Sequence, residues 1–498
     1  MSKHALPPIT RYLEKVARLE GTDKLPLPTR ETAPAELVAI ADQIGSLTGT
    51  WNPVEIMTPT NYRIERQTFL DKFKKGERYN PQFVYGQAKN FPLGTSREEL
   101  LALQQRVRAF EPTKNDGERN KGERIARVVL DFKIKDDLAT IDLVEGLQSI
   151  LTDKEREQGI NAEQKIAQAL NQKYPPLEPN DTLLKISEEH FQDNIHRRKT
   201  KEIKRGLLTT SEVRYLKERK FNASEIARAY TWALEQYGML RTYENPQGFA
   251  VVIDENTSSI DVRDKSTNGP TVFIPAKKIF TGVSLLKNMA HEIEGHARQS
   301  VNGQKLFIVG GGSLKIDNEM LYEGLGKRYD AHVSRELFGT TDGEPLPYYT
   351  FAVQLAAQGK SFSEIFEKML SMRLQVALKI PQREALPSYD AIDEAQLKKA
   401  MTATWLTTYR VMRGHLDTTN KVPFAMTKDL AYLRGYHLDK QLTENGHGHI
   451  NESAIIATSA LQLIAEHQIK EEHLPLRFKD VTRTYWEDIL KPQMQESI

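Results

Sequence analysis

Apolar residues recur at helical spacing through most of this chain, and one stretch near its middle departs from that period. Before residue 245 the pattern predicts helices over 10–18, 35–47 and 61–75, three or four more between 96 and 172, and others within 181–237. Ser96 and Glu99 form a capping-box pattern, which predicts that a helix begins at Ser96. Tyr79, Asn80 and Pro81 predict a turn after the helix over 61–75.

The period changes near residue 246, where three runs rich in β-branched residues are separated by turn residues. These runs, 250–253, 260–262 and 271–274, predict two or three strands. Helical spacing then returns, and helices are expected over 286–303, 318–337, 349–358, 362–378, 391–416 and 451–468. Helices, a small sheet and helices again indicate an α+β fold dominated by helices. Residues 1–54 are interpreted as an N-terminal extension and 55–498 as one domain, helical over 55–245 and containing the sheet over 246–498.

Composition narrows the class of protein. Hydrophobic residues make up 39% of the 498 positions and charged residues 27%, which is a globular profile. The net charge of +2 favours neither a nucleic-acid nor a membrane partner, and no run approaches the length of a membrane span. The chain has no cysteine, so a metal would have to be bound by His, Asp or Glu. With no signal-peptide pattern at the N-terminus, we expect a cytoplasmic location; the oligomeric state is not readable.

Candidate chemistry is concentrated in the stretch His291-Glu292-Ile293-Glu294-Gly295-His296. Two histidines, the first followed by glutamate, are typical of a zinc hydrolase helix, in which the imidazoles bind the metal and the glutamate takes a proton from water. The common motif spaces its histidines by four residues, whereas here they are five apart. Residues five positions apart in an α-helix differ by about 140° around its axis, so in a regular helix the two imidazoles would lie on different faces.

Such a pair converges on one metal only if the helix widens locally, as in a π-bulge, or breaks before the second histidine. Gly295 stands where either distortion costs least. The alternative is an exposed helix with two unrelated histidines, and the spacing alone does not decide between the two.

A catalytic zinc site takes three protein ligands and leaves its fourth position to water. Glu319 and Glu323 lie four residues apart on the next predicted helix and share a face, so either is a candidate for the third ligand. Asp317, Glu319 and Asp330 are candidates to orient the imidazoles through hydrogen bonds.

The order of these motifs resembles that of the bacterial QEGLA-motif proteins and their eukaryotic relatives, the microtubule-associated tyrosine carboxypeptidases. The family's HExxxH motif is matched by His291, Glu292 and His296, and its EGLA-like motif by the run 323–326, EGLG. The flanks of the second motif depart from the family, because Tyr322 replaces Gln and Gly326 replaces Ala. The similarity returns at TYRVMRGH (408–415) and FAMTKDLAYLRG (424–435), and covers roughly residues 55–480.

This resemblance implies a zincin-like catalytic domain with its small sheet next to the metal helix. It implies Zn²⁺ bound by His291, His296 and Glu323, with Glu292 as the general base. The implied activity is a metallocarboxypeptidase that removes a C-terminal residue, tyrosine or glutamate by analogy, from a peptide or protein.

A carboxypeptidase also needs a cation for the terminal carboxylate of its substrate. Arg410, Arg413 and Lys428 are candidates, since the resemblance places their motifs near the cleft; ordinary salt bridges are the alternative. Tyr432 and His415 are candidates to donate a hydrogen bond to the developing oxyanion, and Arg298 is a weaker candidate for the carboxylate.

Two other functions stay open at this point. A zinc endopeptidase or amidase would use the same metal chemistry on an internal bond. A regulatory binding protein would keep the zinc site for structure alone, but it would have no need of the general base Glu292.

Overall fold

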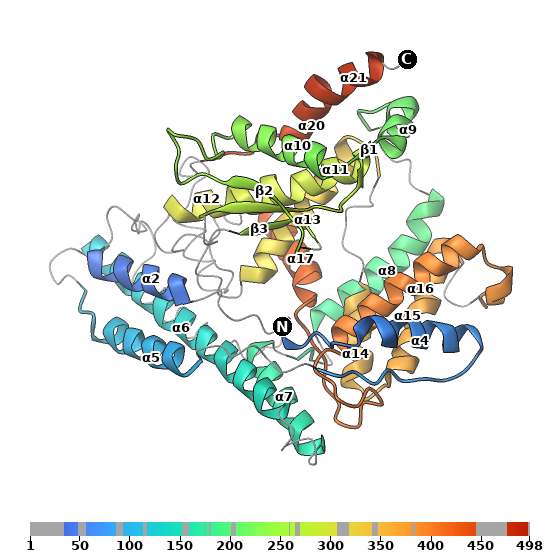
Figure 1. Ribbon diagram of the computed structural model, residues 1–498, viewed down its shortest axis with the longest axis horizontal. Helices are drawn as coiled ribbons and strands as arrows, with labels where there is room; N and C mark the ends of the chain where they lie inside the picture. The colour runs from blue at the N-terminus through green and yellow to red at the C-terminus, as the bar shows by residue number, and fades with distance from the viewer. Residues whose placement is uncertain are drawn as a thin grey trace.

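The computed structural model of the protein is dominated by helices with two small sheets, an α+β fold as predicted (Figure 1). Among the described residues, no helix combines the length and the apolar character of a membrane span. The structure describes residues 34–47, 56–85, 93–112, 117–151, 159–174, 176–178, 181–200, 206–257, 259–263, 269–305, 318–340, 347–380, 384–444 and 476–496. The helices predicted over 10–18 and 451–468 lie outside these residues.

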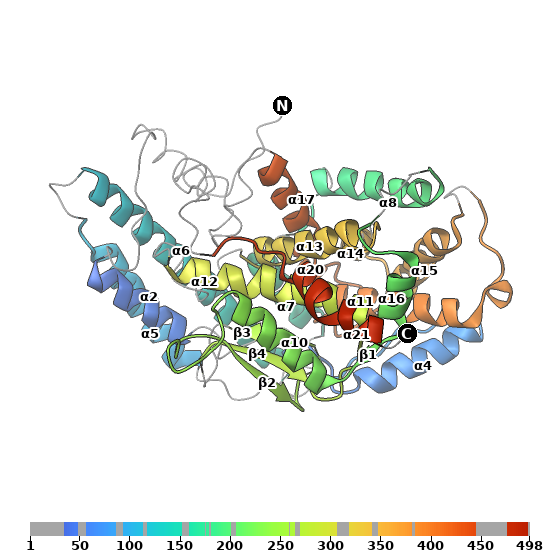
Figure 2. The same cartoon turned by 90° about the horizontal axis from the view of Figure 1, so that it is seen from above.

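All three predicted strands are confirmed. They form one sheet in the order β2-β4-β3, in which β2 (Ala250–Asp254) is parallel and β3 (Asp261–Arg263) antiparallel to the central β4 (Thr271–Pro275). A second, two-stranded sheet pairs β1 (Lys220–Phe221) with β5 (Phe280–Thr281). Helix α10 (Ala223–Gln236) packs on β2 and β4, and Figure 2 shows it lying along the sheet. One face of the sheet therefore lies against α10, and after β4 and β5 the chain enters the helix that carries His291 and His296.

That helix runs from Gly282 to Lys305 and changes its winding in the middle. It consists of α11 (Gly282–Met289), the π-helix η2 (Ala290–Ala297) and α12 (Arg298–Lys305). The Thr281 side chain caps it by accepting a hydrogen bond from the backbone N–H of Ser284. Of the two distortions predicted from the five-residue histidine spacing, a local widening or a break, the local widening is confirmed.

Helix α13 (Asn318–Glu336) lies between this π-helix and α17 (Leu430–Glu444), and glycines allow very close approach on both sides. A Cβ at Gly295 would lie 3.0 Å from the Cα of Gly326, and a Cβ at Gly324 would lie 2.3 Å from the carbonyl carbon of Gly435. The prediction of a helix over 318–337 is confirmed, whereas α17 was not predicted as a helix.

A second core is built on aromatic side chains. Phe69 of α4 (Tyr62–Lys74) contacts Phe362 of α15 (Phe362–Leu378) and Trp405 of α16 (Glu394–Val411) at ring distances of 5.1 and 5.2 Å. Helices α8 (Thr182–Thr200) and α14 (Tyr348–Ala357) complete this region, on the right in Figure 1. The helix predicted over 391–416 ends at Val411, ahead of Gly414, whose φ of 86° is left-handed.

Four helices from the N-terminal half, α2 (Ala35–Leu47), α5 (Leu93–Ala109), α6 (Gly117–Leu151) and α7 (Gly159–Lys173), lie toward the lower left of Figure 1. Helix α2 agrees with its predicted bounds, and it packs on α5 and α6, so this part of the predicted extension contributes to a packed layer. Helix α7 packs on α6.

Two local predictions were wrong, on the start of α5 and on the turn after α4. Ser96 is not an N-cap, because α5 begins at Leu93 and Ser96 is buried within the helix. The turn expected at residues 79–81 lies instead at Gly76, whose φ is 74°. Between residues 96 and 172, where three or four helices were predicted, the described residues form three, α5, α6 and α7.

The short helices around and after these elements were not predicted as separate units. Helix α9 (Thr210–Glu218) precedes β1, and a 3₁₀ turn, η4 (Tyr389–Ala391), precedes α16. The C-terminal helical segment comprises α20 (Val481–Tyr485), the π-turn η6 (Trp486–Leu490) and α21 (Lys491–Glu496), and it packs on α10.

Candidate metal centre

The predicted ligands come together from two helices. His291 and His296 are both buried on η2, and their rings lie 4.7 Å apart and almost perpendicular. Glu323, on α13, faces them, with 3.6 Å between its Oε2 and the Nε2 of His291. One ligand atom from each of the three residues lies within 4.8 Å of the others, so this group could hold a metal ion.

The chemistry of these donors fits zinc. Ligands about 2.0–2.2 Å from a tetrahedral zinc ion lie roughly 3.3–3.6 Å from one another. The observed separation of 3.6 Å between the imidazole of His291 and the carboxylate of Glu323 agrees with this value. Two imidazoles and one carboxylate are also a known protein ligand set of catalytic zinc.

A glycine makes room for the first ligand. A Cβ at Gly326 would lie 2.6–2.8 Å from three atoms of the His291 ring, closer than real Cβ contacts come. The imidazole therefore lies directly on the backbone of α13. This contact gives a physical reason for glycine at the position where the resembled family has alanine.

Asp330 orients His291 from the side away from the cluster. Its Oδ2 lies 3.4 Å from the Nδ1 of His291 and accepts a hydrogen bond of 2.6 Å from the Nζ of Lys327. Burial opposes a charge on His291, but Asp330 and Glu323 outweigh it and raise the pKa of His291 to about 10. Burial likewise opposes the charge of Asp330, and its two cationic partners hold the pKa of that carboxyl below its usual range. The pocket thus favours positive charge at His291.

Glu292 is buried beside the cluster. Burial raises its pKa to about 8, and the carboxylates of Glu323, Asp261 and Asp330 act in the same direction, while a charged His291 opposes them. A divalent cation among these groups would lower this pKa again. The ionisation of Glu292 therefore responds to the charge that the cluster holds.

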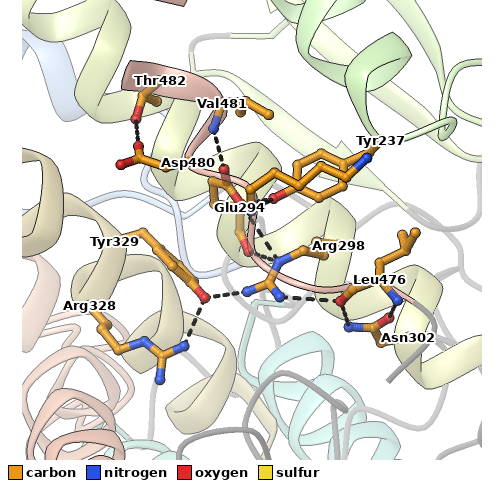
Figure 3. A network of polar contacts seen from close by, with 11 residues as sticks. Tyr237, Glu294, Arg298, Asn302, Arg328, Tyr329, Leu476, Asp480, Val481 and Thr482 are labelled. Atoms are coloured by element: carbon orange, nitrogen blue, oxygen red, sulfur yellow. Dashed lines mark hydrogen bonds and ion pairs between the residues drawn. The ribbon is translucent and has the colours of Figure 1, made fainter. Parts of the chain in front are cut away.

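The other face of the metal helix is fixed by a buried polar network (Figure 3). Glu294 accepts hydrogen bonds from the hydroxyl of Tyr237 and from the backbone N–H of Val481, the latter of 2.8 Å. One turn further, Arg298 lies 3.7 Å from Glu294 and donates to the hydroxyl of Tyr329. Residues distant in sequence thus bind the side chains of Glu294 and Arg298, which flank Gly295 on the helix.

Asn302 adds two hydrogen bonds between the helix and the C-terminal segment. Its side-chain amide donates to the carbonyl of Leu476, and its carbonyl oxygen accepts from the Leu476 N–H, at 3.0 and 2.8 Å. Arg298 is fully buried in the network, which rules out its suggested role in binding a substrate carboxylate.

Two of the predicted substrate-binding residues, Arg410 on α16 and Tyr432 on α17, lie near the start of α17. Arg410 forms an ion pair with Asp429 at 3.1 Å and donates to the hydroxyl of Tyr349 at 3.0 Å. The ring of Tyr432 lies 5.9 Å from the ammonium of Lys327, which places Tyr432 one contact away from Asp330. Lys428 is half-buried in the turn before α17. Substrate binding by these residues stays a prediction.

Arg413 and His415 lie in the aromatic core instead. Arg413 is buried over the ring of Tyr409, 5.0 Å from its centroid. His415 is fully buried, stacks on Phe424 and shares a hydrogen bond with the Phe424 carbonyl; burial lowers its pKa to about 3. His415 is therefore a neutral core histidine, and its suggested role as an oxyanion donor is wrong. Substrate binding by Arg413 stays a prediction.

Sequence reasoning missed Lys327 and the network around Glu294. Lys327 lies one helical turn after Glu323 and three residues before Asp330, a spacing that could have identified it. The partners of Glu294 come from residues 237 and 481, for which the sequence gives no comparable pattern. Of the suggested orienting acids, Asp330 takes that position, while Asp317 and the side chain of Glu319 lie outside the described residues.

No protein-family model matches this sequence, and no curated protein matches it either. The function is therefore inferred from the geometry of the cluster, with the motif resemblance as a supporting expectation.

Proposed function

We propose that this protein is a zinc-dependent metallopeptidase of the carboxypeptidase type, with a zincin-like catalytic domain. One observation carries the proposal: His291 and His296 on a π-helix converge with Glu323 on α13, and Glu292 lies next to the first ligand. A structural zinc site would not require a buried carboxylate at that position. The motif resemblance supports the same activity.

The residues of the cluster have different roles in the proposed mechanism. Zinc, when bound, supplies Lewis acidity and lowers the pKa of a water molecule toward about 7. His291, His296 and Glu323 hold the ion, and Asp330 keeps the Nδ1 of His291 protonated, so that Nε2 is the ligand atom. Glu292 accepts the proton of the attacking water and later donates it to the leaving amine. Burial of Glu292 keeps bulk water from competing for that proton.

The exopeptidase assignment depends on binding of a terminal carboxylate. Arg410 is the proposed cation, because its side chain is 26% exposed and is held in direction by Asp429 and Tyr349, whereas Arg413 is buried. In the proposal it receives the substrate carboxylate at the junction of α16 and α17, with Lys428 and Tyr432 beside it. A C-terminal tyrosine or glutamate is the proposed leaving residue, by the resemblance.

The test is mass spectrometry of a peptide pool incubated with the zinc-loaded full chain. The pool contains each peptide with a free and with an amidated C-terminus, and Glu292→Gln serves as the control. Loss of single residues from free ends alone, absent in the control, is the expected result. Internal cuts, or equal cutting of amidated peptides, would instead identify an endopeptidase or amidase. No cleavage by a zinc-loaded protein would support a binding protein with a structural site.

A further inference from the structure

Lys327 occupies a central electrostatic position that the proposed mechanism does not use. It lies on α13 one turn after Glu323, and its Nζ donates to the Oδ2 of Asp330 at 2.6 Å. The same oxygen lies 3.4 Å from the Nδ1 of His291. The ammonium of Lys327 is thus the nearer of the two partners of that oxygen, and it sets the direction of the carboxylate.

The charges around His291 show why a cation is needed there. Asp330 is almost withdrawn from solvent, with a side chain that is 13% exposed, and Glu292 is buried as well. Glu323 adds a third carboxylate, 3.6 Å from the Nε2 of His291. Charges in such a place are costly unless they are balanced. One divalent ion and one ammonium together balance three carboxylates.

Without the ammonium, Asp330 would keep only the longer contact with His291. A buried carboxylate in that condition tends to rotate toward solvent or another donor, because an unbalanced buried charge costs several kcal/mol. His291 would then lose the group that holds its ring, although its ligand atom Nε2 faces the other way, toward Glu323.

We propose that Lys327 is a positioning residue of the metal centre, which holds Asp330 in place and thereby fixes the imidazole of His291 for metal binding. This inference rests on the proposed metal site, but not on the peptidase activity. Lys327 acts through Asp330, so its contribution disappears when Asp330 can no longer respond to its charge.

The test is a double-mutant cycle on metal affinity, measured with the full chain by competition between the protein and a zinc chelator. Lys327→Met is expected to bind zinc about 10–100-fold more weakly, the usual loss when a group that orients a ligand is removed. Lys327→Arg keeps the charge and is expected to stay close to the wild type. Lys327→Met combined with Asp330→Asn is expected to bind no more weakly than Asp330→Asn alone.

Lys135→Met is the matched control, since Lys135 forms a lysine–aspartate pair of the same length, 2.6 Å, on the surface of α6. It is expected to leave zinc affinity unchanged. The visible spectrum of the cobalt-substituted protein gives a second readout, because a displaced His291 alters the ligand geometry. Thermal unfolding of the metal-free variants separates loss of the site from loss of the fold.

Unchanged zinc binding by Lys327→Met would overturn the proposal, because it would mean that Lys327 has no effect on the metal site. Tighter binding would overturn it as well, because it would mean that Lys327 acts on the metal only by repulsion. Additive effects of Lys327→Met and Asp330→Asn would also overturn it. Failure of the proposed function looks different: a chain that cleaves no peptide, but whose zinc affinity still falls in Lys327→Met, refutes the peptidase and keeps the positioning role. A wild-type chain that takes up no zinc refutes both.

Discussion

Replacing Gly324 with alanine would add one methyl group where two helix backbones already touch. The new Cβ would lie 2.3, 2.4 and 2.6 Å from the carbonyl carbon, carbonyl oxygen and Cα of Gly435. All three are backbone atoms, so no side-chain rotation relieves the overlap. Ordinary contact begins near 3.4 Å, and helices α13 and α17 would have to separate by about 1 Å.

Helix α13 cannot move away from α17 without strain, because it packs against η2 on its other side. Moving it away from α17 presses Gly326 toward Gly295 and the ring of His291, where there is also no room for a Cβ: one on Gly326 would lie 2.6–2.8 Å from the ring. An exposed Gly→Ala change in a helix stabilises by about 1 kcal/mol, whereas overpacking a core costs about 1–3 kcal/mol and more when backbone must move. We therefore expect Gly324→Ala to lower the free energy of unfolding by about 1–3 kcal/mol.

Metal affinity should fall as well. Glu323 directly precedes Gly324, and metal sites tolerate ligand displacements of only about 0.2 Å. The assay compares zinc affinity by chelator competition and the midpoint of denaturant unfolding for the metal-free protein. Gly146→Ala in α6 is the matched control, since a Cβ there meets nothing within 4 Å, and it should be neutral or stabilising by about 0.5–1 kcal/mol. If Gly324→Ala behaved like Gly146→Ala in both assays, the close packing of α13 would not position the third ligand.

Three further changes test other parts of the molecule. Glu323→Ala should abolish tight zinc binding in the chelator assay, and full zinc occupancy would move the third ligand elsewhere. Glu294→Ala should destabilise the fold by about 3–5 kcal/mol in denaturant unfolding, because Arg298 would stay buried without its carboxylate; a loss below about 1 kcal/mol would speak against a buried ion pair. His415 has a pKa of about 3 when folded and near 6.5 when unfolded, so its contribution to stability is complete above pH 6.5 and declines as the pH falls toward 3. His415→Phe should therefore flatten the loss of stability between pH 7 and pH 4, and an unchanged pH profile would contradict the neutral core assignment.

The sequence predicted best where one local requirement left few solutions. The strands β2, β3 and β4 follow from runs of β-branched residues between turn residues. The π-helix is one of the two distortions that the five-residue spacing of His291 and His296 predicts for a shared metal, the other being a break before His296. Here the residue types and their spacing carry enough information without knowledge of the rest of the chain.

Prediction failed where the decision lies in tertiary contacts. Ser96 has the pattern of a helix cap, but burial of Leu93 favours a helix that begins three residues earlier. The third ligand could be narrowed only to Glu319 or Glu323 from spacing, and the resemblance was needed to choose Glu323. Lys327 was missed because its importance comes from Asp330 and His291 together, and only the packing of α13 on η2 joins these residues.

The π-helix also explains why the fold needs the network behind it. A π-turn widens the helix and is rarely stable by itself, so the surrounding structure must compensate. All eight residues of η2 are buried. Glu294 of η2 and Arg298, the first residue of α12, are satisfied by Tyr237, Tyr329 and the backbone of the C-terminal segment. These contacts hold the helix at the residues that flank Gly295, where the winding departs from α. The geometry of the proposed metal ligands His291 and His296 thus depends on a segment nearly two hundred positions later in the chain.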